Sequence, residues 1–279
     1  MIKIGNYNTL TVARDVDFGL YLTDGEGNEV LLPRKFVPNE LPADGKLRVF
    51  VYTDSEDRPI ATTVAPYAVA GEFAFLQVKD VNATGAFLDW GVEGKDLLVP
   101  FAQQKARMLR GGIYPVYVYL DRASGRVIAS AKIEKYLDNV YPDYHPGSKV
   151  RALILEHTPI GFRAIVDNAH RGMIYDSDLD KPLELQQTVN AYVRCVRDDG
   201  RIDLSVAPPA SQRTAILGHT IMRALKDGGG RLALSDASSP EEIHKTLGCS
   251  KKDFKKAIGH LYREGRITIG VDHIELATK

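Results

Sequence analysis

The sequence predicts a mainly β protein, with three copies of one small β unit followed by a C-terminal α+β domain. The first observation is a glycine that opens an apolar, strand-forming run at three places, Gly19, Gly85 and Gly161. The second is an arginine that leaves a tight turn into a last strand, 39, 41 and 40 residues after those glycines, at Arg58, Arg126 and Arg201. Constant spacing at a changing position indicates three copies of one unit, each about the size of a small domain.

Composition places the chain among globular proteins. Of its 279 residues, 44% are hydrophobic and 26% are charged, which is ordinary for a folded domain. No run of about 18 apolar residues could span a bilayer, and no signal-peptide core follows Met1, so we expect a cytoplasmic protein without a membrane partner. Cys195 and Cys249 are too few for a disulfide framework or a four-cysteine zinc site.

Charge is unevenly distributed among the four domains that we expect, at residues 1–66, 67–144, 145–208 and 209–279. The formal net charge of the whole chain is zero, which argues against binding nucleic acid by bulk charge alone. The four segments carry −3, 0, −1 and +4, and the last has 12 Lys and Arg residues against 8 Asp and Glu. Only the C-terminal segment is therefore basic.

Each repeat is predicted to form five short strands. In the second repeat they are expected at residues 71–81, 85–90, 95–100, 113–120 and 127–131, separated by Gly, Asn and Asp turns. The connection between the third and fourth strands, residues 101–110, is the long one. Five antiparallel strands with one long connection at this place predict a small OB-type barrel.

Helical periodicity begins after Pro208 and Pro209. We expect helices at residues 210–226, from Ser239 to Gly248, and from Ser250 to about Glu264, followed by a hairpin of residues 266–270 and 273–277. A helix, a short helix, a turn, a third helix and a two-stranded wing are the order of a winged helix-turn-helix domain.

Two sets of residues carry a family resemblance. Gly19-Leu20-Tyr21-Leu22 and Gly85-Ala86-Phe87-Leu88 resemble the second strand of the S1-type RNA-binding domain, and the third repeat matches less closely. Three such units before the C-terminal run Ser250-Lys251-Lys252-Asp253-Phe254 resemble the conserved virulence factor B family of bacterial RNA-binding regulators. The resemblance implies three tandem S1-type OB-fold barrels and a winged helix. It also implies a non-enzymatic, cytoplasmic protein that binds RNA and influences gene expression after transcription.

The S1 resemblance assigns candidate RNA contacts in the barrels. Stacking aromatics flank the second-strand glycine in such domains, and Phe18 with Tyr21 occupy both places in repeat one, whereas repeat two keeps only Phe87. In repeat three the candidates are Arg163, Tyr175, Arg194, Arg197 and Arg201. A strand aromatic is more often part of the core, and this alternative applies most strongly to Phe87 and Trp90.

The third predicted helix has two opposite faces at 100° per residue. Phe254, Ile258 and Leu261 lie on one face, and Lys252, Lys256, Gly259 and Arg263 lie on the other. Glycine in mid-helix costs about 1 kcal/mol relative to alanine, which close approach of a ligand would explain. The predicted nucleic-acid contacts on this helix are Lys252, Lys255, Lys256 and Arg263. The alternative is an ordinary solvated lysine face.

These observations favour a non-catalytic protein that binds single-stranded RNA and regulates gene expression after transcription. No hydrolase, zinc-protease or phosphate-loop motif occurs, so we expect no enzymatic activity, no cofactor and no metal site. Two alternatives remain open. One is a transcriptional regulator that binds duplex DNA through the winged helix, and the other is an interaction scaffold without nucleic acid.

Overall fold

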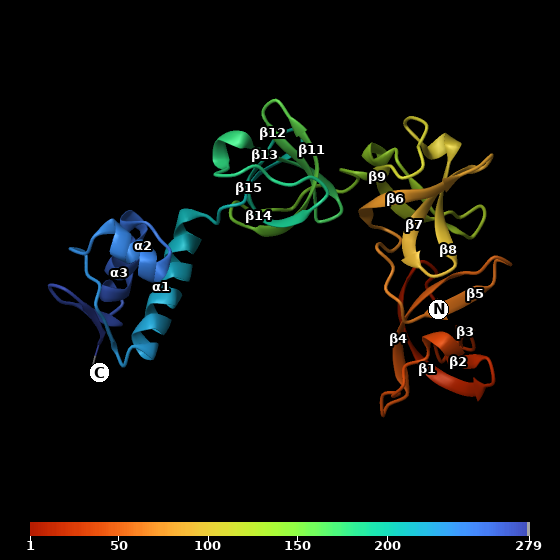
Figure 1. Cartoon of the computed structure of the whole chain (residues 1–279), viewed down its shortest axis with the longest axis horizontal. Coiled ribbons are helices and arrows are strands. Elements are labelled where there is room, and N and C mark those ends of the chain that lie inside the picture. Colours follow the sequence, from red (N-terminus) through yellow and green to blue (C-terminus); the bar gives the residue numbers. More distant parts are fainter. Residues whose placement is uncertain (278–279) are drawn as a thin grey trace. The chain divides into compact units, whose positions relative to one another are not determined.

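The computed structural model describes residues 1–277 and confirms the predicted fold class (Figure 1). Three five-stranded barrels, here called barrel 1, barrel 2 and barrel 3, are followed by a helical domain with a small sheet. The chain divides into two compact units. One contains residues 1–143, 151–189 and 196–203, and the other contains residues 144–150, 190–195 and those from Leu204 onward.

Barrel 1 is closed, with strand order β1-β2-β3-β5-β4. Its third and fifth strands are parallel, paired through Leu31 and Ile60, so the prediction of five antiparallel strands was wrong at this position. The reason is that barrel closure brings β5 against β3, and their direction is then fixed by the connections. The strands are β1 (Asn6–Val16), β2 (Gly19–Thr23), β3 (Glu29–Pro33), β4 (Lys46–Thr53) and β5 (Pro59–Thr62).

Barrel 2 has the strand order β10-β9-β6-β7-β8, with β8 and β10 adjacent to each other. The order repeats that of barrel 1, although no ladder between β8 and β10 closes this sheet. The strands are β6 (Phe73–Val81), β7 (Gly85–Val92), β8 (Lys95–Pro100), β9 (Ile113–Leu120) and β10 (Val127–Ser130).

Barrel 3 is closed in the order β11-β12-β13-β15-β14, the order of barrel 1. A one-turn 3-10 helix follows the third strand of every barrel and begins the long connection: η1 (Arg34–Phe36), η2 (Phe101–Gln103) and η4 (Asp176–Asp178). Another, η3 (Ile133–Tyr136), follows barrel 2. The strands of barrel 3 are β11 (Lys149–Thr158), β12 (Gly161–Val166), β13 (His170–Tyr175), β14 (Thr188–Val196) and β15 (Ile202–Ser205).

The three repeated glycines have the same structural role. A Cβ atom on Gly19, Gly85 or Gly161 would lie 2.2 to 2.3 Å from the carbonyl oxygen of Leu32, Val99 or Ile174, respectively. Each of these oxygens belongs to the third strand of the same barrel. Any side chain would therefore force the second and third strands apart at the point where they begin to pair.

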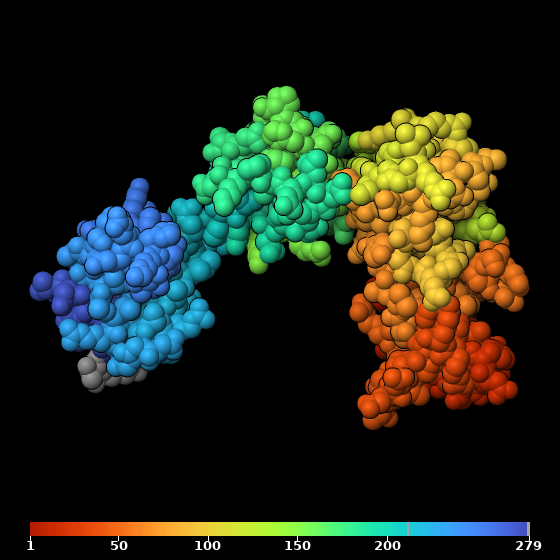
Figure 2. Space-filling model, viewed as in Figure 1, coloured from red at the N-terminus to blue at the C-terminus, as the bar shows by residue number. Residues whose placement is uncertain are grey.

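One hydrophobic core cluster joins barrels 1 and 2, because Phe50 and Tyr52 of barrel 1 pack with the buried residues of barrel 2. The other buried apolar residues of barrel 1 form a second cluster. Trp90 of β7 is 1% exposed and packs edge-on against Phe50 of β4, with ring centroids 5.3 Å apart. The Trp90 indole Nε1 donates a 2.7 Å hydrogen bond to the carbonyl of Ala68. Arg126 donates two more hydrogen bonds, of 2.5 and 2.6 Å, to the carboxylate of Asp57. Figure 2 shows the two barrels in direct contact, in red to yellow.

The C-terminal domain has the predicted winged-helix order. Ser239 and Glu242 form the expected capping box at the start of the short helix, and Gly248 ends it with φ +66°. One strand, β16, was not predicted; its two residues pair with β18 and make the wing sheet three-stranded, in the order β16-β18-β17. The elements are α1 (Ala210–Asp227), β16 (Arg231–Leu232), α2 (Pro240–Leu247), α3 (Lys251–Arg263), β17 (Ile267–Ile269) and β18 (Ile274–Leu276).

Candidate nucleic-acid interface

A pocket of about 350 Å³ opens on the surface of barrel 3. Arg163 in β12 pairs across the ladder with Met173 in β13, so two neighbouring strands contribute adjacent lining residues. Two further arginines come from the end of β14 and the turn into β15, and an exposed isoleucine precedes β12. The lining side chains are Ile160, Arg163, Arg171, Met173, Arg197 and Arg201.

Each arginine in this pocket has an acidic partner. The atom pairs are Arg163 Nη1 and Glu156 Oε1 at 2.5 Å, Arg171 Nε and Asp138 Oδ2 at 2.8 Å, Arg197 Nη2 and Asp203 Oδ1 at 2.8 Å, and Arg201 Nε and Asp199 Oδ2 at 3.5 Å. The Arg171 contact is an ion pair without hydrogen-bond alignment. The four arginine side chains are 36 to 58% exposed, so water screens the pairs. The pocket therefore presents four guanidinium groups but little net charge.

Two residues predicted for barrel 3 do not line this pocket. The hydroxyl of Tyr175 donates a 3.2 Å hydrogen bond to Asp203 and also contacts the guanidinium of Arg197. The hydrogen bond with Asp203 raises the pKa of Arg197. Tyr175 thus contacts Arg197 without lining the pocket. Arg194 is exposed on β14 and also lies outside the pocket lining.

Arg171, Met173 and the four acids were not predicted from the sequence. Arg171 and Met173 are two positions apart along β13, so their side chains lie on the same face of the sheet. Arg163 of β12 pairs with Met173 and lies on that face too. This alternation was a usable signal. The partnership with Asp138 was not, because that acid lies 33 residues before Arg171 and outside the barrel strands.

The predicted aromatic pair of barrel 1 lies partly at the surface. Phe18 is 58% exposed, and its ring meets that of Tyr21 edge-on with centroids 6.3 Å apart. The guanidinium carbon of Arg14 lies 4.0 Å from the centroid of the Tyr21 ring, which covers one ring face. Phe18 therefore has open ring surface, whereas Tyr21 is half-buried.

In barrel 2 the corresponding cations are engaged at the joint with barrel 1. Arg126 pairs with Asp57 and lowers the pKa of that carboxyl, whereas Asp121 accepts a 2.6 Å hydrogen bond from Ser124. Lys95 donates to the carbonyl of Asp54 at 3.1 Å, and its burial lowers the pKa of its ammonium group. Phe87 of β7 is half-buried and offers no exposed ring like that of Phe18.

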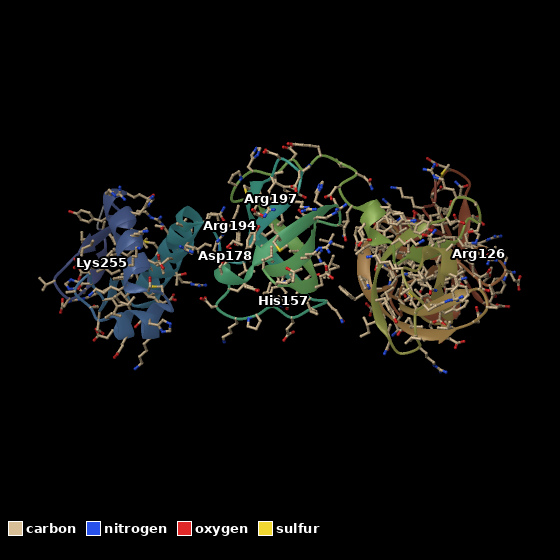
Figure 3. All side chains as sticks on the ribbon, turned by 90° about the horizontal axis from the view of Figure 1, so that it is seen from above. Arg126, His157, Asp178, Arg194, Arg197 and Lys255 are labelled. Carbon is tan, nitrogen blue, oxygen red and sulfur yellow. The ribbon has the colours of Figure 1, made fainter. Side chains whose placement is uncertain are left out.

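Helix α3 has the two faces that its sequence predicts. Phe254, Ile258 and Leu261 are 0 to 2% exposed in the domain core. The opposite face carries the exposed cations Lys252, Lys256 and Arg263, and the exposed Lys255 lies to one side of that face. Lys255 is labelled in Figure 3 together with Arg197 of barrel 3. Four exposed cations of α3 form no ion pair with an acid within residues 1–277, unlike the arginines of the pocket. They are Lys252, Lys255, Lys256 and Arg263.

Gly259 lies in the middle of this cationic face. A Cβ atom added to it would meet nothing within 4 Å, so packing inside the domain does not require glycine here. Its backbone carbonyl accepts a 3.1 Å hydrogen bond from Arg263 Nε, which keeps that guanidinium close to the helix. Glycine at this position costs the helix about 1 kcal/mol relative to alanine, and no packing contact inside the domain accounts for it.

No helix in the described part of the chain is both long and apolar enough to cross a membrane. In the same residues, no three or more His, Cys, Asp or Glu side chains come together in a way that could hold a metal ion.

Comparison with known proteins matches both ends of the chain to domain families. Residues 4–64 match the S1 domain, and residues 219–276 match the CvfB-like winged helix domain. A solved structure from Streptococcus pneumoniae, described as a multidomain protein with nucleic acid binding domains, is 21% identical over 98% of both chains with a TM-score of 0.40.

Two curated relatives are similar to nearly the whole chain. YitL of Bacillus subtilis is 27% identical over 95% of this chain and 91% of its own length. Conserved virulence factor B of Staphylococcus aureus is 26% identical over 93% of this chain and 89% of its own length. These matches confirm the resemblance predicted from the sequence: residues 4–64 match the S1 domain, residues 219–276 match the CvfB-like winged helix domain, and nearly the whole chain is similar to conserved virulence factor B.

Proposed function

We propose that this protein binds single-stranded RNA in the cytoplasm without catalysing a reaction, and that it regulates gene expression after transcription. The observation that carries the proposal is the arginine pocket of barrel 3, which combines Arg163 and Arg197 with the exposed apolar side chain of Ile160. Single-stranded RNA is held by grooves that offer both cations and surfaces on which unstacked bases can lie. Both matched domain families are binding modules and not enzymes.

The cationic face of α3 supplies the second part of the proposed interface. Lysine has no planar fork for bidentate reading of a base, so Lys252, Lys255 and Lys256 are suited to phosphate contacts. Gly259 leaves an open path for a backbone between them. We therefore assign sequence-independent attraction to α3, and contact with bases to the barrels.

The four domain boundaries remain part of this proposal. The first three ranges, 1–66, 67–144 and 145–208, each contain the five strands of one barrel, and 209–279 contains α1, α2, α3 and the wing. In this division the pocket and the cationic helix belong to different domains. Their contributions to binding are therefore separable by substitution.

A second candidate function is binding of duplex DNA as a transcriptional regulator. It is favoured by one observation, the unpaired cations on the third helix of a winged-helix domain, which is the element that such domains place in the major groove. Under this function the barrels would contact other proteins. A scaffold without any nucleic-acid partner is the third class, and it predicts no binding to any of the probes below.

Competition binding tests these alternatives directly. A labelled single-stranded RNA would be displaced from the full-length protein by unlabelled single-stranded RNA, duplex RNA or duplex DNA of equal length, at 50, 100 and 200 mM salt. The salt concentration is fixed because affinities for nucleic acid depend on it. We expect single-stranded RNA to compete best at each of the three concentrations. Stronger competition by duplex DNA would instead support the transcriptional regulator.

A further inference from the structure

We propose that the pocket of barrel 3 holds a nucleobase between arginine guanidinium planes and apolar side chains, and that it does not bind phosphate. This inference rests on the proposed function, because it specifies which part of the RNA enters the pocket. It assigns a different ligand group to the pocket and to α3, although both surfaces are rich in cations.

Carboxylates already occupy part of the guanidinium edges of Arg163 and Arg197. Phosphate is captured by the in-plane N–H groups of arginine, which form two parallel hydrogen bonds. In the pocket, Arg163 already uses Nη1 for Glu156 at 2.5 Å, and Arg197 uses Nη2 for Asp203 at 2.8 Å. A phosphate would have to displace these carboxylates or lie beside them, and like charges repel at such distances.

The flat faces of the guanidinium groups and the apolar side chains of the pocket remain available to a ligand. A guanidinium group bonded along its edge still presents its flat faces, and these stack on aromatic rings. Ile160 is 60% exposed and Met173 is half-buried in the same pocket, which provides apolar contact for the other side of a ring. A flat base satisfies both surfaces, whereas a hydrated phosphate satisfies neither.

The size of the pocket also fits a single nucleobase. The pocket volume of about 350 Å³ is near the lower limit of small-molecule sites, which span about 300 to 1,000 Å³. This space suits one base and its sugar, and not a folded or double-stranded segment. Ile160 and Arg163 also occupy the two places where the S1 resemblance puts stacking aromatics, so barrel 3 replaces an aromatic platform with an arginine platform.

The test is a substitution that preserves charge and removes the flat group. Arg163→Lys together with Arg171→Lys keeps both positive charges, and lysine can still pair with Glu156 and Asp138. If a base lies on the guanidinium planes, affinity for single-stranded RNA should fall by about three- to thirty-fold with no change in salt slope. The matched control is Arg110→Lys with Arg122→Lys, two exposed arginines of barrel 2 outside the pocket, which should leave affinity unchanged.

An abasic oligonucleotide with the same backbone identifies the group that is bound. The Arg163→Lys, Arg171→Lys protein should bind this probe as well as the unsubstituted protein does, because no base is present to lose. Ile160→Ser is a second variant at an exposed turn position, with little effect on folding expected, and it should weaken binding only to the RNA that carries bases.

The outcomes separate the inference from the proposed function. Equal loss on both probes, or no loss on either, would overturn the base pocket while RNA binding itself stands. A lower salt slope in the lysine variant would also overturn it, because that result indicates a lost phosphate contact. If the unsubstituted protein binds neither probe, then the proposed function itself is wrong.

Discussion

The pocket of barrel 3 and the outer face of α3 each carry four cations, but they differ in how those cations are paired. Every arginine of the pocket lies within 3.5 Å of a carboxylate oxygen. The cations of α3 have no acidic partner among residues 1–277. The difference shows that counting basic residues does not identify a phosphate-binding surface, because an acid-paired guanidinium contributes shape and contact area more than net charge.

The largest expected effect follows from removing the unpaired cations. Lys252→Ala, Lys256→Ala and Arg263→Ala together should lower the magnitude of the salt slope of log K by about 2, because each lost phosphate contact on a single strand accounts for about 0.7. Binding should weaken to a similar extent for RNAs of any sequence. The measurement is a salt titration of binding to two unrelated single-stranded RNAs.

The control for this variant removes the same charge from another face of the domain. Arg213→Ala, Arg223→Ala and Lys226→Ala on α1 are exposed positions with the same total charge change. This variant should keep nearly the full salt slope. Equal losses in both triple variants would mean that only the net charge of the domain matters, and the distinction between the two surfaces would fail.

A base contact without any charge sharpens the comparison. Phe18→Ala should weaken RNA binding by about 1 to 3 kcal/mol and leave the salt slope unchanged, since a stacked base is lost and no phosphate contact is lost. The melting temperature should change little because the Phe18 ring is 58% exposed. A strongly lowered melting temperature, of the kind expected for the buried control Phe50→Ala at about 3 to 5 kcal/mol, would reassign Phe18 to the core.

Gly259 allows stability and binding to be separated on α3. Gly259→Ala should raise the free energy of unfolding by up to about 1 kcal/mol, because helix propensity improves and the added methyl group meets no neighbour. The same methyl group should weaken RNA binding if a backbone approaches the helix there. Chemical denaturation and binding measured on one preparation test both effects, and stabilisation without loss of affinity would argue against close approach.

The smallest effect is predicted for a substitution that makes one arginine of the pocket resemble the unpaired cations of α3. Glu156→Gln removes the negative charge that pairs with Arg163 and leaves this guanidinium without an ionic partner. The salt slope of RNA binding should then become steeper by about 0.7, the value for one additional phosphate contact. Glu26→Gln, at an exposed acid of barrel 1, changes the net charge equally and should leave the slope unchanged.

The regular features of the fold were predictable from the sequence because they depend on local patterns. Alternating apolar residues located the strands of barrel 2, and Ser239 with Glu242 located the start of α2. The parallel contact between β3 and β5 was not predictable in this way. It results from closure of the barrel, which no local sequence pattern specifies.

The candidate site was predictable as a set of cations, but its pairing was not. The helical period placed Lys252, Lys256 and Arg263 on one face, and the structure has them exposed there. In barrel 3, sequence reasoning did not find Arg171 or foresee that Tyr175 would bond to Arg197. The ion pair between Arg171 and Asp138 joins residues 33 positions apart and depends on tertiary structure, so no local sequence pattern reveals it.

The chain contains a single tryptophan, and its position gives the protein an internal optical reporter. Trp90 is enclosed in the core that barrels 1 and 2 share, away from both cationic surfaces in the sequence and bonded through its indole nitrogen. Its fluorescence should therefore be blue-shifted in the native protein and indifferent to RNA that occupies the pocket or α3. A shift of emission to longer wavelength would signal that the joint between the first two barrels has opened.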